Sequence, residues 1–118
     1  MNHKEYNGWY NYETWLLNLW IDNDGDSQGY WNDSAQEAYD HAKADRTFTQ
    51  EERAKLDLAN AIKEHFEEAE ADILERAGIQ SSFWADMLGA ALSEVNWYEI
   101  ASHMLDGVEN EEAADVED

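Results

Sequence analysis

The stretch Asn7–Asn23 limits the fold of this chain more than any other, because it concentrates large apolar side chains. A protein interior is the ordinary place for such a concentration, since burying one large ring removes roughly 150–250 Å² from water. The stretch is therefore predicted to form the first helix and the hub of a hydrophobic core. Its large apolar members are Trp9, Tyr10, Tyr12, Trp15, Leu16, Leu17, Leu19, Trp20 and Ile21.

A helix is expected from about Tyr12 to Asp22, with Asn11 as its N-cap. At about 100° per residue, only Thr14, Asn18 and Asp22 share a polar strip on that helix. A helix that is apolar nearly all round is normally enclosed by other helices. The pattern thus predicts that the rings face the core, with a protein-binding surface as the alternative.

The remainder of the chain also favours helices, because it has no Pro, few Gly and no strand-like alternation. A loop is expected over Asp22–Ser27 and a second helix over roughly 28–44. Thr49 and Glu52 form a capping-box pattern that begins a third helix, and Gly78 is the expected stop after Ala77. A fourth helix follows Ser81 or Ser82 and contains an apolar set. That set is Phe83, Trp84, Met87, Leu88, Ala91 and Leu92.

A fifth helix is expected from Asn96 to Gly107. The last stretch, 108–118, has six acids in eleven residues and is predicted to be a disordered tail. The fold expected from the sequence is therefore an all-α bundle of four to five helices. It forms a single domain over residues 1–107, followed by the acidic tail over 108–118.

The strong negative charge of the chain limits which kinds of molecule it can bind. The chain of 118 residues has 28 acidic and 7 basic side chains, a formal net charge of −21. A field of that sign repels nucleic acid and anionic lipid and attracts basic surfaces. Direct nucleic-acid or membrane binding is therefore not expected, and exposed rings would lack the basic groove that base stacking needs. Solubility alone, or adaptation to a salty cytoplasm, would explain the charge equally well.

The third helix carries acids opposite its apolar stripe. Neighbouring carboxylates such as Glu64, Glu67 and Glu68 repel one another at a cost of a few tenths of a kcal/mol per pair. The functional interpretation is a surface that imitates the phosphates of a duplex and occupies a basic protein. The predicted partner-binding face consists of Glu52, Asp57, Glu64, Glu67, Glu68, Glu70 and Glu75.

Catalytic and metal-binding patterns are weak. Asp22, Asp24 and Asp26 have the opening spacing of a calcium loop, but Ser27 stands where that loop needs Gly, so they are only a weak metal candidate. No nucleophile elbow or phosphate-binding loop is present. No catalytic residue and no cofactor is therefore assigned. With no Cys and no secretory signal at the N-terminus, a cytoplasmic location is expected.

Two blocks carry a resemblance to a known group of proteins. The segment Trp9–Asn23 resembles a family of small uncharacterised proteins from phages, plasmids and other mobile elements, whose signature is W-x-N-Y-E-T-W…L-W-x-D-N. The segment 96–101 is similar to the family's second block. The resemblance implies a setting, a phage or mobile-element accessory protein in the host cytoplasm, and no activity. The signature residues expected in the core are Trp9, Asn11, Tyr12, Trp15, Trp20 and Trp97.

Taken together, these patterns predict a non-catalytic binding protein that occupies a basic host protein, in the manner of a nucleic-acid mimic. One alternative is a helical adaptor, or a homo-oligomer, that uses an exposed part of the Trp/Tyr cluster at Tyr10 and Tyr12. The other is a salt-adapted domain whose acids serve only solubility.

Overall fold

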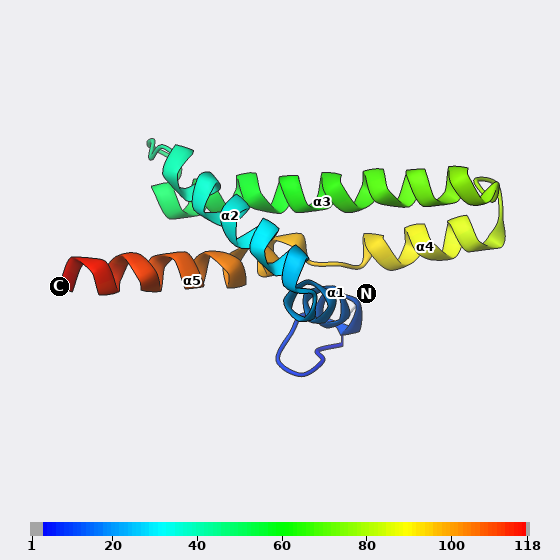
Figure 1. Cartoon of the computed structure of the whole chain (residues 1–118), viewed down its shortest axis with the longest axis horizontal. Helices are drawn as coiled ribbons and strands as arrows, with labels where there is room; N and C mark the ends of the chain where they lie inside the picture. The colour runs from blue at the N-terminus through cyan, green and yellow to red at the C-terminus, as the bar shows by residue number, and fades with distance from the viewer. Residues whose placement is uncertain (1–3, 118) are drawn as a thin grey trace.

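Five helices make up the part of the chain that the structure, a computed structural model, describes (Figure 1). The described backbone covers residues 4–117, with side chains over 4–108, and contains no strand. The helices are α1 Tyr12–Asn23, α2 Gly25–His41, α3 Gln50–Ala77, α4 Phe83–Ser93 and α5 Trp97–Glu117. The all-α prediction is confirmed.

The junction of α1 and α2 corrects the loop expected over Asp22–Ser27. Asp24 is the one residue between the helices, and it serves as the C-cap of α1 and the N-cap of α2. Its carboxylate accepts hydrogen bonds from the backbone N–H of Asp26 at 3.1 Å and the hydroxyl of Ser27 at 3.3 Å. The Asp and Ser residues that suggested a loop instead cap a helix, because the Asp24 side chain accepts from a backbone N–H of the first turn that has no partner within the helix. The second helix therefore begins three residues earlier than expected and ends at His41.

The start and end of α3 follow the sequence prediction. The hydroxyl of Thr49 accepts from the N–H of Glu52 at 3.1 Å, and the carboxylate of Glu52 accepts from the N–H of Thr49 at 2.9 Å. Asp45 orders the preceding loop, and the backbone N–H groups of Phe48 and Thr47, together with Arg53, hold the pKa of its carboxyl below its ordinary value. Gly78 closes the helix in the left-handed conformation at φ 71°.

Core residues come mainly from α2, α3 and α5, which pack against one another. The largest side chains removed from water include Leu58, Ile62, Ile100 and Leu105. Helix α5 runs straight through Gly107, so the helix end expected there is wrong. Val108 is also buried in the core, which removes it from the predicted tail. The rest of that tail has side chains outside the described part of the chain, and its disorder stays a prediction.

Two Gly→Ala substitutions should have opposite effects on stability. At Gly78 a Cβ would meet no atom within 4 Å, but φ is 71°, so Gly78→Ala is expected to cost about 1 kcal/mol of unfolding free energy. At Gly107, inside α5, a Cβ also meets nothing, so Gly107→Ala should add roughly 0.5–1 kcal/mol. Urea unfolding followed by circular dichroism measures both. Destabilisation by Gly107→Ala would contradict the continuous helix.

The far half of α3 leaves the core and pairs only with α4, forming an arm of two antiparallel helices (Figure 1). We define this arm as residues 69–93. Leu74 is buried there, outside the main core cluster. None of the side chains of α4, all of which the structure describes, is buried. The arm is therefore a two-helix layer in which Leu74 is the one buried side chain of residues 69–93.

Candidate binding surfaces

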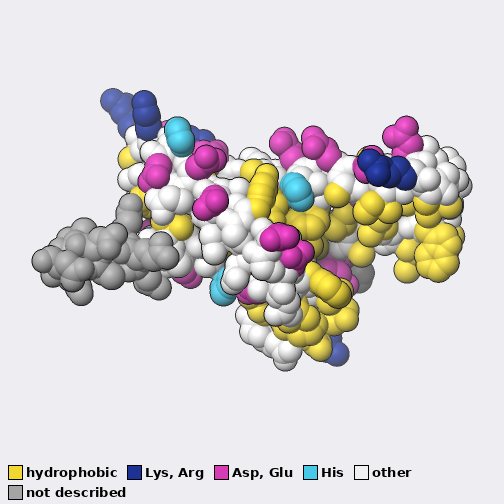
Figure 2. Space-filling model, viewed as in Figure 1, with side chains coloured by type: hydrophobic (Ala, Val, Ile, Leu, Met, Phe, Trp, Pro, Cys, Tyr) yellow, Lys and Arg dark blue, Asp and Glu magenta, His cyan; other side chains and the backbone are white. Residues whose placement is uncertain are grey.

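The acidic face of α3 is largely open to solvent (Figure 2). At about 100° per residue, Asp57, Glu64, Glu68 and Glu75 fall within about 40° of one another around the helix. All four side chains are exposed. At 1.5 Å of rise per residue they extend over about 27 Å. We call these four residues the acidic stripe.

The other three predicted acids point elsewhere. Glu52 is exposed, but its carboxylate is held by the N–H of Thr49 in the capping box. Glu67 and Glu70 line the groove between α3 and α4, where the Oε2 of Glu70 lies 3.5 Å from the position of a Cβ on Gly89. The single face predicted from the sequence is thus an open stripe of four carboxylates that adjoins a groove at Glu75, which lines the same hollow as Glu67 and Glu70.

Basic side chains near α3 pair with acids outside the acidic stripe. Lys55 lies 2.8 Å from Glu51, and Arg76 lies 3.0 Å from Asp72. Lys63 lines the α3–α4 groove with Glu67 and Glu70. Neither ion pair involves a member of the acidic stripe, so the negative field of the stripe faces solvent.

Two members of the polar strip of α1, Thr14 and Asn18, face inward, whereas the third, Asp22, is exposed. Thr14 is fully buried, and Asn11 and Asn18 are also buried. The hydroxyl of Thr14 donates to the Oδ1 of Asn11 at 2.6 Å and accepts from the backbone N–H of Asn96 at 2.9 Å. The side-chain amide of Asn11 donates to the carbonyl of Glu94 at 2.6 Å. We call this set of hydrogen bonds the Asn11–Thr14 clamp.

A further bond extends the clamp, because the backbone N–H of Tyr10 donates to the carboxylate of Glu99 at 2.8 Å. The backbone N–H of Glu99 in turn donates to the Oδ1 of Asn96 at 3.1 Å. The two blocks that carry the family resemblance therefore meet in space. Their contact depends on buried polar groups as well as on rings.

With Thr14 and Asn18 inside, part of the ring cluster is left outside. Tyr12 is 47% exposed and Trp20 is 69% exposed, so the prediction that they are core residues is wrong. Trp9 and Trp97 do pack against the core, as predicted. Trp15 is half-buried and stacks on Tyr12 with ring centroids 5.7 Å apart.

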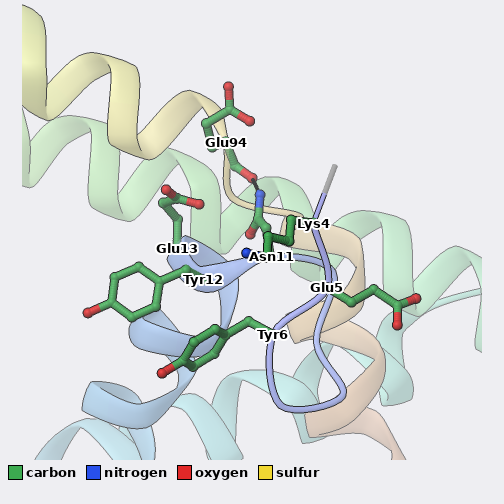
Figure 3. A pocket seen from close by; sticks show the side chains of 7 residues that line it. All are labelled: Lys4, Glu5, Tyr6, Asn11, Tyr12, Glu13 and Glu94. Carbon is green, nitrogen blue, oxygen red and sulfur yellow. Dashed lines mark hydrogen bonds between the residues drawn. The ribbon is translucent and has the colours of Figure 1, made fainter. Parts of the chain in front are cut away.

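A shallow pocket of about 410 Å³ opens beside these rings (Figure 3). The rings of Tyr6 and Tyr12 lie edge to face with centroids 5.0 Å apart, and their hydroxyls point away from Asn11. Figure 3 shows the side-chain amide of Asn11 directed toward the backbone carbonyl of Glu94, with their hydrogen bond drawn as a dashed line. The remaining lining residues are Lys4, Glu5 and Glu13. Rings flanked by carboxylates suit a cationic or amphipathic protein side chain.

The weak metal candidate does not form a site. Within residues 4–108, no three His, Cys, Asp or Glu side chains are grouped closely enough to hold an ion. Asp24 caps α2, and Asp22 accepts a hydrogen bond from Asn18 at 3.0 Å. In the described part of the chain, no helix has the length and apolar character to cross a bilayer.

A model of a family of unknown function, DUF7249, matches residues 2–116 of the chain. The chain belongs to this family. No curated protein and no solved structure matches it. Membership of DUF7249 covers nearly the whole chain, so helices α1 to α5 all belong to the family's shared region.

Sequence reasoning missed the exposed rings because it assumed that the wider, apolar side of α1 must face the core. A signal was available in the spacing of Asn11, Thr14 and Asn18, which recurs at i+3 and i+4 and places three small polar residues in one row. Such a row can be buried when most of its polar groups find hydrogen-bond partners. Asn11 and Thr14 are bonded in this way, whereas the Oδ1 of Asn18 is buried without a partner.

Proposed function

We propose that this protein is a non-catalytic binding protein whose acidic surface occupies a basic protein of the host cell, in the cytoplasm. The observation that carries the proposal is the acidic stripe, Asp57, Glu64, Glu68 and Glu75, exposed along one side of a 28-residue helix. The formal net charge of −21 adds a long-range field that speeds encounter with a positive partner. The resemblance to mobile-element proteins supports a host target.

The finer form of the proposal is that the partner's nucleic-acid-binding face is the target. Successive members of the acidic stripe are about 6–10 Å apart along the helix axis. One DNA strand places a phosphate about every 3.4 Å. The stripe thus has the sign and the linear form of a phosphate backbone at a lower charge density. We infer competition with nucleic acid for a basic groove, with other acids of the surface supplying the remaining charge.

Capture from a host-cell extract tests this proposal. The full chain is immobilised, and bound proteins are eluted with a rising salt gradient and identified. A basic nucleic-acid-binding protein should elute as salt increases, since exposed charges are screened over about 8 Å at physiological ionic strength. Its binding to DNA in a mobility-shift assay should fall as the acidic chain is added. If the chain and DNA bind the captured protein together, the mimicry proposal fails.

A second candidate function is a helical adaptor that binds through the rings at the start of α1. The exposure of Tyr12 and Trp20 favours it, because large exposed rings are typical anchors of protein interfaces. Trp20→Ala with Tyr12→Ala is expected to lower affinity for such a partner by about 2 kcal/mol or more, roughly thirtyfold.

Isothermal titration at low and high salt measures that loss and separates the two functions. Binding through the rings should keep its affinity when salt is raised, whereas binding through the acidic stripe should weaken. Loss of the folded helical spectrum in the Tyr12 and Trp20 variant would remove support for a surface role. Tyr30→Ala, an exposed ring on α2, serves as the matched control.

A further inference from the structure

Hydrophobic side chains gather on the arm of residues 69–93, over both α3 and α4 (Figure 2). Phe83 is 63% exposed, Trp84 64%, Met87 53% and Ile73 57%. The rings of Phe83 and Trp84 contact each other with centroids 5.1 Å apart. These four side chains form what we call the arm patch.

Ile73 of the arm patch lies on the same side of α3 as apolar residues that are buried in the core nearer the start of that helix. Leu58 and Ile62 lie on the inner side of α3 and are almost wholly removed from water. Ile73 follows Ile62 by eleven residues, which returns it to nearly the same side at about 100° per residue. It is exposed because α2 and α5 do not reach that far along α3 (Figure 1). The same apolar side of α3 therefore lacks a covering layer on the arm.

Charge distinguishes the arm patch from the rest of this acidic chain. From residue 77 to residue 93 the sequence contains one charged residue, Asp86, whereas 30% of the whole chain is charged. The patch is thus a poor match for the basic partner of the acidic stripe. An anionic membrane is also unsuitable, since the net charge of −21 would be repelled by it.

We propose that the arm patch is covered by the arm of a second copy of this chain. Two α3–α4 arms packed face to face form a four-helix layer, an arrangement that encloses such a stripe between its helices. The contact places the two nearly uncharged segments 77–93 together, where repulsion between two acidic chains is least. This surface differs from the acidic stripe and from the rings of α1, so the proposal is independent of the proposed function.

The available area fits a weak dimer. Each large side chain of the patch exposes on the order of 100 Å², given the roughly 150–250 Å² that a full ring buries. Four such side chains on each copy, with the small residues around them, give on the order of 1,000 Å² in total. That is close to the lower limit for a specific interface. We therefore expect reversible dimers that form in the micromolar range.

Salt gives this contact a signature opposite to that of the acidic stripe. Screening lowers the repulsion between the two chains and leaves burial of the arm patch unaffected. Dimerisation should therefore strengthen as salt rises, whereas binding of a basic partner should weaken. One protein preparation can show both trends.

Sedimentation equilibrium of the full chain, from about 1 to 200 µM and at low and high salt, tests the proposal. The average mass is expected to rise from 13.7 kDa toward twice that value with concentration, and more steeply at high salt. A chain that stays monomeric throughout this range overturns the proposal.

Trp84→Glu should hold the chain at the monomer mass with an unchanged helical spectrum, because the side chain is mostly exposed before association. Trp20→Glu is the matched control, an equally exposed Trp on α1, and should dimerise like the parent. Met87→Glu provides a second substitution in the arm patch. Dimers lost with Trp20→Glu and kept with Trp84→Glu would overturn the assignment to the arm. Dimers kept in both arm variants would also overturn it.

Discussion

Thr14→Val is expected to lower the free energy of unfolding by about 2 kcal/mol, although it changes neither the size nor the branching of a fully buried side chain. The hydroxyl accepts from the backbone N–H of Asn96 and donates to Asn11. A methyl group can do neither, so the N–H of Asn96 loses its partner. A buried polar group left unpaired costs about 1–3 kcal/mol.

Asn11→Ala should have an effect at least as large, about 2–3 kcal/mol. It removes the N-cap of α1, where Oδ1 accepts from the N–H of Thr14 at 2.9 Å. It also removes the bond from the side-chain amide to the carbonyl of Glu94. Because Asn11 and Thr14 share the clamp, the double variant should lose less stability than the sum of the two single losses.

Urea unfolding followed by circular dichroism and by Trp fluorescence measures these losses. Thr47→Val provides the matched control, since the same substitution at an exposed position in the α2–α3 loop should change stability by less than about 0.5 kcal/mol. Equal effects at Thr14 and Thr47 would show that the clamp contributes nothing beyond side-chain packing.

The clamp also explains which parts of the fold were predictable from the sequence. The N-caps Asn11 and Thr49 and the left-handed Gly78 act on groups within four residues, so their patterns identify helix ends locally. The orientation of α1 depends instead on a bond between Thr14 and Asn96, 82 residues apart. The residue pattern around Thr14 does not reveal that its partner is Asn96. The rule that the apolar side of a helix faces the core therefore predicted a buried Trp20, which is exposed in the structure.

Gly107 and Asp24 illustrate the same limit at two helix boundaries. A Gly after an apolar stripe is typical of a helix end, but Leu105 and Val108 both reach the core and keep α5 continuous through Gly107. A run of Asp and Ser is typical of a loop, but Asp24 alone turns the chain from α1 into α2. At Gly107 packing decides between two outcomes that the local sequence permits, and at Asp24 the capping bonds from Asp26 and Ser27 do so.

The acidic face is divided into a stripe and a groove because α4 packs against one side of α3. The sequence of α3 alone does not predict where α4 packs. Glu67 and Glu70 belong to the apparent acidic face, yet they line the groove against α4. Charge reversal at these two positions would therefore disturb the arm as well as the surface field. A test of partner binding therefore uses Asp57, Glu64 and Glu68, the exposed members of the acidic stripe that do not line the groove.

Reversing Asp57, Glu64 and Glu68 to Lys is expected to abolish capture of a basic partner, with a loss of affinity of a hundredfold or more. Each reversal replaces an attraction with a repulsion, and single charge changes at such contacts cost up to 2–5 kcal/mol when the pair is desolvated. The fold should survive, because these side chains are exposed. Helical content should change little, since the repulsion between Glu64 and Glu68 at i,i+4 becomes a repulsion between two Lys.

The matched control is the triple reversal of Asp33, Glu37 and Asp40 on α2, which are also exposed. Both variants change the formal net charge from −21 to −15, because three reversals add six units. Titration calorimetry with the captured partner compares them at one salt concentration. If the two variants lose affinity equally, only the overall charge matters and the acidic stripe is not a binding site. If neither loses affinity, the acids serve solubility, and the exposed rings of α1 become the surface to which a partner must be assigned.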